Sequence, residues 1–217
     1  LEGGLFPYTR RYLKNFDSHF NTIGIVGMHE CCRNFMGKGI DTPEGKAFAL
    51  EVLDHLRKRM ADLQEDTGEL FNLEATPAES TSYRLAKHDK SRYPEIVTAG
   101  VDEPYYTNSS QLPAEFTDDL FDALDHQEAL QSRYTGGTVF HMFLGEAVED
   151  WRAVRDLVKA VSYRYRIPYY TVSPTFSVCP VHGYISGEHF SCPKCKAEKE
   201  ARIRDEIAVL ERELAES

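Results

Sequence analysis

The pattern of apolar and polar positions predicts helices and short strands in alternation along most of the chain. Apolar residues three or four positions apart predict helices, whereas short runs rich in β-branched residues predict strands. The predicted helices span 6–20, 29–36, 42–68, 120–130 and 146–163. The predicted strands span 21–28, 70–75, 136–143 and 168–172, and we expect the first of them to be buried. This alternation favours an α/β fold with a mostly parallel sheet.

The longest predicted helix carries start and stop signals at its two ends. Thr42 can cap its first turn, Pro43 suits the first helical position, and Gly68 can end the helix in a left-handed conformation. Its apolar residues share one face, which we expect to pack into the core: Phe48, Val52, Leu53, Leu56, Met60 and Leu63.

A turn rich in hydroxyl groups follows the predicted strand 70–75. Glu79, Ser80, Thr81 and Ser82 stand where a helix begins, and free backbone N–H groups at such a point can hold phosphate oxygens. The same residues could instead cap the helix, and the local sequence alone favours the cap.

Residues 88–117 lack strong periodicity and are predicted to form a long ordered loop, a kind of segment that is often functional. Asn108 and Gln111 lie in its most polar part, where they could offer hydrogen-bond donors and acceptors to a sugar or a base. A network that only orders the loop is the alternative, and composition does not separate the two.

Two pairs of metal-binding residues lie close together towards the C-terminus. Two residues separate Cys179 from His182, and two separate Cys192 from Cys195, which is the spacing of zinc knuckles. Four protein ligands leave no open position on a tetrahedral ion, so the site would be structural. A disulfide is one alternative for these cysteines, and His189 could replace His182 as a ligand.

Beyond Cys195 the chain becomes strongly charged. Residues 197–217 are predicted to form one helix, whose apolar residues repeat after four, three and four positions: Ile203, Ile207, Leu210 and Leu214. About two heptads are too few for an independent coiled coil, so we expect this helix to pack on its parent protein.

The charge and composition limit the possible partners. A net charge of −10 lacks the basic footprint that nucleic-acid binding demands, so we expect no nucleic-acid partner. The sequence has neither a run of about eighteen apolar residues nor the apolar core of a signal peptide. We therefore expect a cytoplasmic protein without a membrane partner, and Cys31 and Cys32 fit a reducing compartment.

Six motifs, in this order, resemble the anaerobic ribonucleoside-triphosphate reductases, the oxygen-sensitive glycyl-radical class. They are FPYTR at 6–10, NTIGIVGM at 21–28, NLEATPAESTSYR at 72–84, YTNSSQLP at 106–113, GGTVFH at 136–141 and SPTFSVCPVHG at 173–183. The resemblance covers nearly all of residues 5–195.

The resemblance implies part of a ten-stranded α/β barrel at residues 1–173, a zinc-binding subdomain at 174–196 and a charged amphipathic helix at 197–217. It implies an enzyme that reduces ribonucleoside triphosphates to deoxyribonucleotides. In that family a radical-SAM activase places a radical on a glycine, and the radical passes to a cysteine that attacks the substrate. The complete enzyme would be a homodimer that ATP and dNTP effectors regulate through an N-terminal domain.

Carried over residue by residue, the resemblance makes the turn from Glu79 to Ser82 a holder of substrate phosphates, which overturns the preference for a cap. It places Glu79 near the reacting ribose and the loop from Asn108 to Gln111 at the same barrel mouth. It implies these structural zinc ligands: Cys179, His182, Cys192 and Cys195. The radical cysteine and the glycyl-radical segment have no counterpart in this sequence, so we expect the chain to be inactive alone. A truncated or split zinc-containing module that needs a partner chain is the alternative.

Overall fold

The computed structural model describes residues 1–100, 103–113, 116–117, 119–144, 148–174, 176–186 and 192–215. The chain forms two compact units. Unit 1 comprises Leu1–Phe140 with Val161–Tyr170, and unit 2 comprises His141–Ala160 with Thr171–Ser217.

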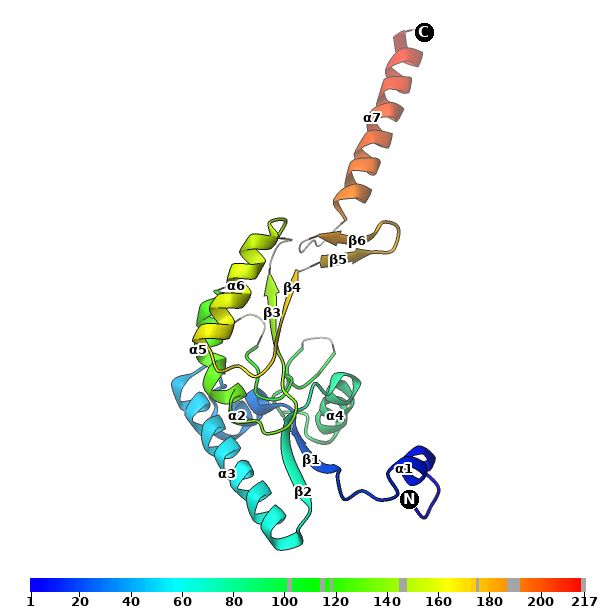
Figure 1. Ribbon diagram of the computed structural model, residues 1–217. Helices are drawn as coiled ribbons and strands as arrows, with labels where there is room; N and C mark the ends of the chain where they lie inside the picture. Colours follow the sequence, from blue (N-terminus) through cyan, green and yellow to red (C-terminus); the bar gives the residue numbers. More distant parts are fainter. Residues whose placement is uncertain are drawn as a thin grey trace. The chain divides into compact units, whose positions relative to one another are not determined.

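Helices and strands alternate through most of the chain, as the sequence pattern predicts (Figure 1). The helices are α1 (Pro7–Tyr12), α2 (Met28–Met36), α3 (Pro43–Thr67), α4 (Glu79–Arg92), α5 (Leu120–Gln131), α6 (Trp151–Arg164) and α7 (Pro193–Ala215). The strands are β1 (Phe20–Ile25), β2 (Leu70–Ala75), β3 (Phe140–Leu144), β4 (Tyr170–Pro174), β5 (Phe176–Cys179) and β6 (Gly183–Ser186). The predicted α/β class is confirmed.

The strands of the described ranges form three two-stranded sheets, β1–β2, β3–β4 and β5–β6. β1 and β2 run parallel, from the pair of Phe20 and Leu70 to the pair of Ile25 and Ala75. Helices α2 and α3 connect them, because parallel strands need a crossover rather than a hairpin. β5 and β6 instead form an antiparallel hairpin. A ten-stranded barrel would join more strands than these and stays a prediction.

Helix α3 begins and ends where its sequence signals predict. The hydroxyl oxygen of Thr42 accepts a hydrogen bond from the N–H of Gly45 at 3.1 Å. Gly68 has a φ of 72°, and its N–H donates to the carbonyl of Gln64 at 3.0 Å. The cap and the left-handed glycine thus satisfy backbone groups that a helix end leaves open.

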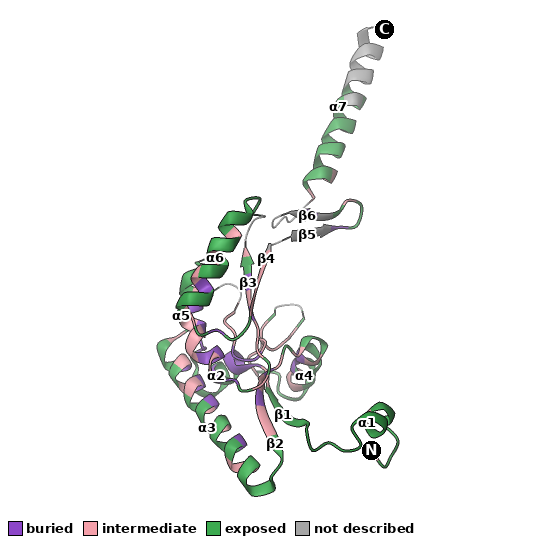
Figure 2. Ribbon diagram, in the orientation of Figure 1, coloured by how far each residue is buried: buried purple, intermediate pink, exposed green. Residues whose placement is uncertain are grey.

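The core of unit 1 lies where α2, α3 and β2 meet (Figure 2). Leu53 of α3 and Leu73 of β2 are fully buried, which confirms the apolar face predicted for α3. Burying a leucine side chain contributes roughly 1.5–3 kcal/mol. The buried members of this core are Met28, Cys32, Ile40, Ala49, Leu53, Met60, Leu73, Ala75, Leu130 and Tyr134.

The helix predicted for 6–20 is wrong beyond its first turns. α1 ends at Tyr12, and Lys14 has a φ of 70°. Just after it, the side-chain amide of Asn15 donates to the Asp17 carboxylate at 2.6 Å, and the N–H of Asp17 donates back to Asn15 Oδ1 at 3.3 Å. Such local bonds compete with helical hydrogen bonds, so the apolar spacing alone misled the prediction.

Strand β1 is exposed, whereas the sequence predicts it to be buried. Phe20 is 54% exposed and Ile23 is 40% exposed. Among the described strands only β2 pairs with β1, so one edge of β1 has no neighbouring strand there. The β-branched run therefore predicts the strand but not its burial.

Several other boundaries differ from the prediction. β3 begins at Phe140 rather than at 136, and α7 begins at Pro193 rather than at 197. α4 continues to Arg92, so the start of the predicted loop 88–117 is helical. α6 begins at Trp151 rather than at 146, and residues 145–147 lie outside the described ranges. Within those ranges no helix combines the length and the apolar character needed to cross a membrane.

Candidate functional site

Two structural elements of unit 2 bring the predicted metal ligands together. Cys179 ends β5, and His182 lies in the turn that leads to Gly183 at the start of β6. Gly183 has a φ of 68°, a conformation that glycine adopts without strain. Cys192 directly precedes α7, and Cys195 lies in its first turn. A hairpin and a helix N-terminus thus each supply one pair.

The four side chains match the geometry of a tetrahedral site. Zn–S bonds of about 2.3 Å and Zn–N bonds of about 2.0 Å place sulfurs about 3.8 Å apart and a sulfur about 3.5 Å from a nitrogen. The Cys179 and Cys195 sulfurs are 3.6 Å apart. His182 Nδ1 lies 3.7, 3.4 and 3.3 Å from the sulfurs of Cys179, Cys192 and Cys195. All four ligand atoms lie within 4.8 Å of one another, so the cluster can hold a metal ion such as zinc.

Backbone N–H groups support the sulfurs. The N–H of Val181 donates to the Cys179 sulfur at 3.4 Å, and the N–H of Cys195 donates to the Cys192 sulfur at 3.3 Å. All five cysteines are free thiols, so the disulfide alternative has no support in the structure. His189, the other alternative ligand, lies outside the described residues.

Glu198 is a member of this site that the sequence analysis missed. His182 Nε2 lies 2.9 Å from Glu198 Oε1, so the ring nitrogen that faces away from the sulfurs has a carboxylate partner. Metal-binding histidines commonly donate their second N–H to such a group, which fixes the ring orientation. The available signal is that Glu198 follows Cys195 by three positions on α7, which places both on one helix face.

Electrostatics also suit metal binding. Hydrogen bonds from the backbone N–H groups of His182 and Val181 lower the pKa of Cys179 to about 6. The hydrogen bond to Glu198 raises the pKa of His182 to about 9. The hydrogen bond to Cys179 raises the pKa of Cys195 to about 12, because it favours the protonated thiol, and repulsion from the neighbouring sulfurs acts in the same direction. A bound cation offsets this repulsion, since metal ligation deprotonates thiols.

The hydroxyl-rich turn forms the start of α4 in unit 1. The N-cap position belongs to Ala78, with a φ of 57° and no side-chain cap, so the alternative of a Ser or Thr side-chain cap at this position has no support in the structure. Glu79 has a φ of 24°, and both Glu79 and Ser80 are exposed. Thr81 is half-buried and Ser82 is buried. Exposure therefore decreases along the turn, from Glu79 and Ser80 at the helix N-terminus to the buried Ser82.

Ser82 joins this turn to the long loop. Its hydroxyl donates to the carbonyl of Tyr106 at 2.6 Å and accepts from the N–H of Tyr106 at 3.1 Å. The Tyr106 hydroxyl donates to Asp89, also on α4, at 2.7 Å. The two predicted substrate segments, the turn at 79–82 and the loop at 106–111, therefore lie side by side, and Ser82 connects them.

Asn108 and Gln111 lie where β1 ends. Asn108 forms an antiparallel bridge with Val26, and its carbonyl accepts from the N–H of Gln111 at 2.9 Å. The side-chain amide of Gln111 donates to the carbonyl of Val139 at 2.7 Å. The Gln111 side chain thus connects the loop to the backbone at Val139, and Asn108 is held at the carboxyl end of a parallel strand.

A family model described as anaerobic ribonucleoside-triphosphate reductase matches residues 1–212. The chain belongs to this family. The resemblance drawn from the six motifs is therefore confirmed.

Curated reductases of this family align with most of the chain. The anaerobic ribonucleoside-triphosphate reductase of Haemophilus influenzae is 26% identical over 182 residues, which are 80% of this chain and 25% of that protein. The Escherichia coli reductase is 25% identical over 189 residues, which are 84% of this chain and 26% of that protein. The chain thus spans about a quarter of the length of these relatives.

Solved structures of anaerobic ribonucleotide reductases also match most of the chain. The anaerobic ribonucleotide reductase of Thermotoga maritima with glycerol in its active site matches with a TM-score of 0.67 and 27% identity, over 89% of this chain and 32% of that one. The same enzyme in complex with dATP and CTP matches with a TM-score of 0.66 and 26% identity, over the same shares.

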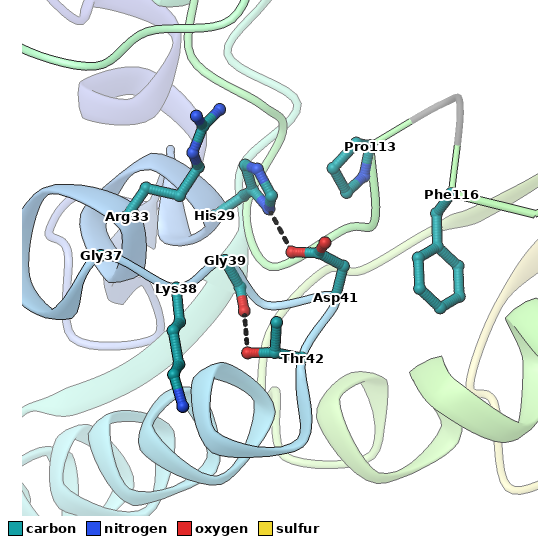
Figure 3. Close-up of a pocket in the computed structure, with 9 residues that line it drawn as sticks. All are labelled: His29, Arg33, Gly37, Lys38, Gly39, Asp41, Thr42, Pro113 and Phe116. Atoms are coloured by element: carbon teal, nitrogen blue, oxygen red, sulfur yellow. Dashed lines mark hydrogen bonds and ion pairs between the residues drawn. The ribbon is translucent and has the colours of Figure 1, made fainter.

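A separate hollow of about 460 Å³ opens beside α2 and the start of α3 (Figure 3). His29 Nδ1 lies 3.6 Å from the nearest Asp41 oxygen, which is longer than a hydrogen bond. Arg33 and Lys38 also line it, so it mixes charges of both signs and selects no single class of ligand. None of the predicted site residues is among its nine lining residues.

Proposed function

We propose that this chain contributes the substrate-phosphate cradle and the structural zinc site of an anaerobic ribonucleotide reductase. That enzyme would convert ribonucleoside triphosphates to deoxyribonucleotides by glycyl and thiyl radical chemistry. The observation that carries the proposal is the pair of hydrogen bonds between Ser82 and Tyr106, which sets the α4 turn against the loop of Asn108.

The parallel pairing of β1 and β2 supports a ligand site at this edge. Ile25 pairs with Ala75, so the segments that follow both strands emerge on the same side of the sheet. In α/β folds ligands bind at the carboxyl ends of the strands. The N-terminus of α4 follows β2 there, and its open N–H groups and positive dipole end favour phosphate.

Individual roles follow from exposure and charge. Ser80 is exposed and Thr81 is half-buried, so their hydroxyls are available to phosphate oxygens. Glu79 is an exposed carboxylate that repels phosphate, and a ribose hydroxyl is the better partner for it. Asn108 would supply an amide to the same substrate. Ser82 and Gln111 would hold the two segments in place.

The metal would support the fold rather than the reaction. Cys179, His182, Cys192 and Cys195 fill all four positions of a tetrahedral ion, which leaves none for a substrate. When bound, zinc would tie the hairpin of β5 and β6 to α7.

The remaining parts of the proposed enzyme are inferred from what is typical of the family. The radical cysteine, the glycyl radical, a radical-SAM activase, a homodimer and effector sites for ATP and dNTP are all proposed for the complete, cytoplasmic reductase. Its nucleotide substrates are supported by the Thermotoga maritima structure in complex with dATP and CTP. On this view the 217 residues alone would not turn over.

The second candidate is a zinc-containing module that is inactive until it pairs with a partner chain. Exposed apolar residues favour it: Leu5 and Tyr8 in unit 1 are 82% and 75% exposed, and Ile203 and Ile207 on α7 are 45% and 49% exposed. The side chains of Leu210 and Leu214 lie outside the described residues. Removal of 203–217 would abolish the association, and a chain that stays monomeric would contradict this candidate.

The test uses the gene product that carries this sequence, purified without oxygen and combined with its activase. Deoxynucleotide formation from CTP is measured for the wild type and for Ser80→Ala/Thr81→Val. Each lost phosphate hydrogen bond worth about 1.4 kcal/mol weakens binding about tenfold, so we expect the KM for CTP to rise at least about tenfold. Ser91→Ala, at the other end of α4, is the control and should leave the KM unchanged. An unchanged KM in the double variant would remove these two residues from the cradle.

A further inference from the structure

Glu30 of α2 is a buried carboxylate that accepts two hydrogen bonds from Thr107 in the long loop, a contact that we call the Glu30 clamp. It is 1% exposed. Its Oε1 accepts a hydrogen bond from the Thr107 hydroxyl at 2.6 Å, and its Oε2 accepts from the Thr107 N–H at 3.0 Å. A carboxylate in a buried position needs such donors, because burying a polar group without hydrogen-bond partners is costly. Thr107 directly precedes Asn108, so this clamp acts on the neighbour of a proposed substrate ligand.

The start of α2 holds the same loop through its backbone. The N–H of Gly27 donates to the Thr107 carbonyl at 2.8 Å, and the N–H of Met28 donates to the Ser109 carbonyl at 3.0 Å. Ser109 has a φ of 42°, which is strained for a residue with a side chain. Strain of this kind persists only where the surroundings enforce it.

Buried side chains in and just after α5 hold the loop at Ser110, the residue that follows Ser109. The Gln127 side-chain amide donates to the Ser110 carbonyl at 3.2 Å, and the Tyr134 hydroxyl donates to the Ser110 hydroxyl at 2.8 Å. Gln131 donates to Gln127 Oε1 at 2.8 Å, so the amide of Gln127 is itself oriented. Ser110, Gln127 and Gln131 are completely buried. Asn108 and Ser109 are therefore held on both sides, by Glu30 at Thr107 and by Gln127 and Tyr134 at Ser110.

We infer that Glu30 is a positioning residue, which fixes Thr107 and thereby sets the place of Asn108 against a ribonucleoside triphosphate without touching it. The inference rests on the proposed function. A core that needed only stability would gain little from a buried carboxylate, since apolar residues of similar volume stabilise as well or better. A strained turn that is clamped on both sides is what a preorganised binding group requires.

The experiment is a double-mutant cycle in the same gene product, assayed without oxygen with CTP. Glu30→Gln keeps the shape of the side chain but weakens the contact with Thr107, because a neutral amide oxygen replaces the carboxylate and the NH₂ group fits only if the Thr107 hydroxyl turns to accept. Thr107→Val removes only the hydroxyl. We expect each variant to raise the KM for CTP about tenfold, with kcat within about twofold. The double variant should be no worse than either single variant, because both changes remove one interaction.

Two controls separate positioning from folding. Thr107→Ser retains the hydroxyl and should keep the wild-type KM. Glu51→Gln, on the exposed face of α3, should change neither the KM nor the melting temperature. Should Glu30→Gln fail to fold, Thr107→Val still tests the clamp.

The outcomes are distinct. A lower melting temperature with an unchanged KM would make Glu30 a structural residue and overturn the inference, as would KM effects that multiply in the double variant. A wild-type enzyme that forms no deoxynucleotide would contradict the proposed function itself, and the inference would fall with it.

Discussion

The ring of His182 lies between the sulfur cluster and a carboxylate, with its Nε2 2.9 Å from Glu198 Oε1. This partner orients the ring so that Nδ1 faces the three cysteines. Loss of such a partner typically weakens metal affinity by about 10–100-fold.

Glu198→Gln should therefore weaken zinc binding within that range while leaving all four ligands in place. Competition with a chromophoric chelator measures the affinity. Glu200→Gln, on the same helix and also exposed, is the matched control. Equal affinities of the two variants would show that the carboxylate has no part in the site.

Cys192→Ser should release the metal, because a serine hydroxyl is a poor zinc ligand. Closed zinc sites stabilise their local fold, so hydrogen exchange should accelerate within residues 174–196 while the β1–β2 region stays protected. Metal content per chain and hydrogen exchange are the two measurements. Cys31→Ser, which alters an exposed free thiol, should retain the metal. Undiminished metal in Cys192→Ser would refute the ligand assignment.

Ser82→Ala should destabilise unit 1, because it leaves both backbone groups of Tyr106 without their partner. An unsatisfied buried polar group costs about 1–3 kcal/mol. The free energy of unfolding from urea titration checks this value. Ser80→Ala, an exposed position two residues away, should stay within about 0.5 kcal/mol of the wild type. Equal losses in the two variants would contradict the anchoring role of Ser82.

His126 should make unit 1 less stable in acid. Burial lowers the pKa of His126, and its Nε2 donates to the Ile40 carbonyl at 2.8 Å while Nδ1 accepts from Gln127 at 3.3 Å. The folded state thus favours the neutral ring. Below about pH 6.5 the unfolded chain binds more protons, so the free energy of unfolding falls as the pH drops through that region.

His126→Asn should flatten this part of the pH profile. Urea titrations between pH 5 and 7.5 provide the comparison, and His55→Asn on the exposed face of α3 is the control. A profile as steep in His126→Asn as in the wild type would assign the acid sensitivity to other groups.

Local signals in the sequence predicted much of this structure. Thr42 and Gly68 bound α3 as predicted, and β2 occupies 70–75 as expected. The metal ligands could be predicted because each pair is close in sequence, and a two-residue spacing constrains a turn directly. Features of this kind depend on a few neighbouring residues.

Long-range contacts explain what the sequence did not show. Ser82 and Tyr106 are 24 positions apart, and Glu30 and Thr107 are 77 positions apart. No spacing rule connects such residues, so the role of Ser82 as an anchor became visible only in the structure. The exposure of β1 likewise depends on which strands lie beside it.

The most direct measurement is a crystal structure of the complete gene product bound to CTP, prepared without oxygen. The account predicts triphosphate oxygens at the N-terminus of α4, within hydrogen-bond distance of the Ser80 and Thr81 hydroxyls, and a ribose hydroxyl near Glu79. It also predicts that Asn108 contacts the nucleotide while Glu30 contacts Thr107 alone. A nucleotide bound elsewhere, with the turn of 79–82 and the loop of 107–111 both free of it, would contradict the account.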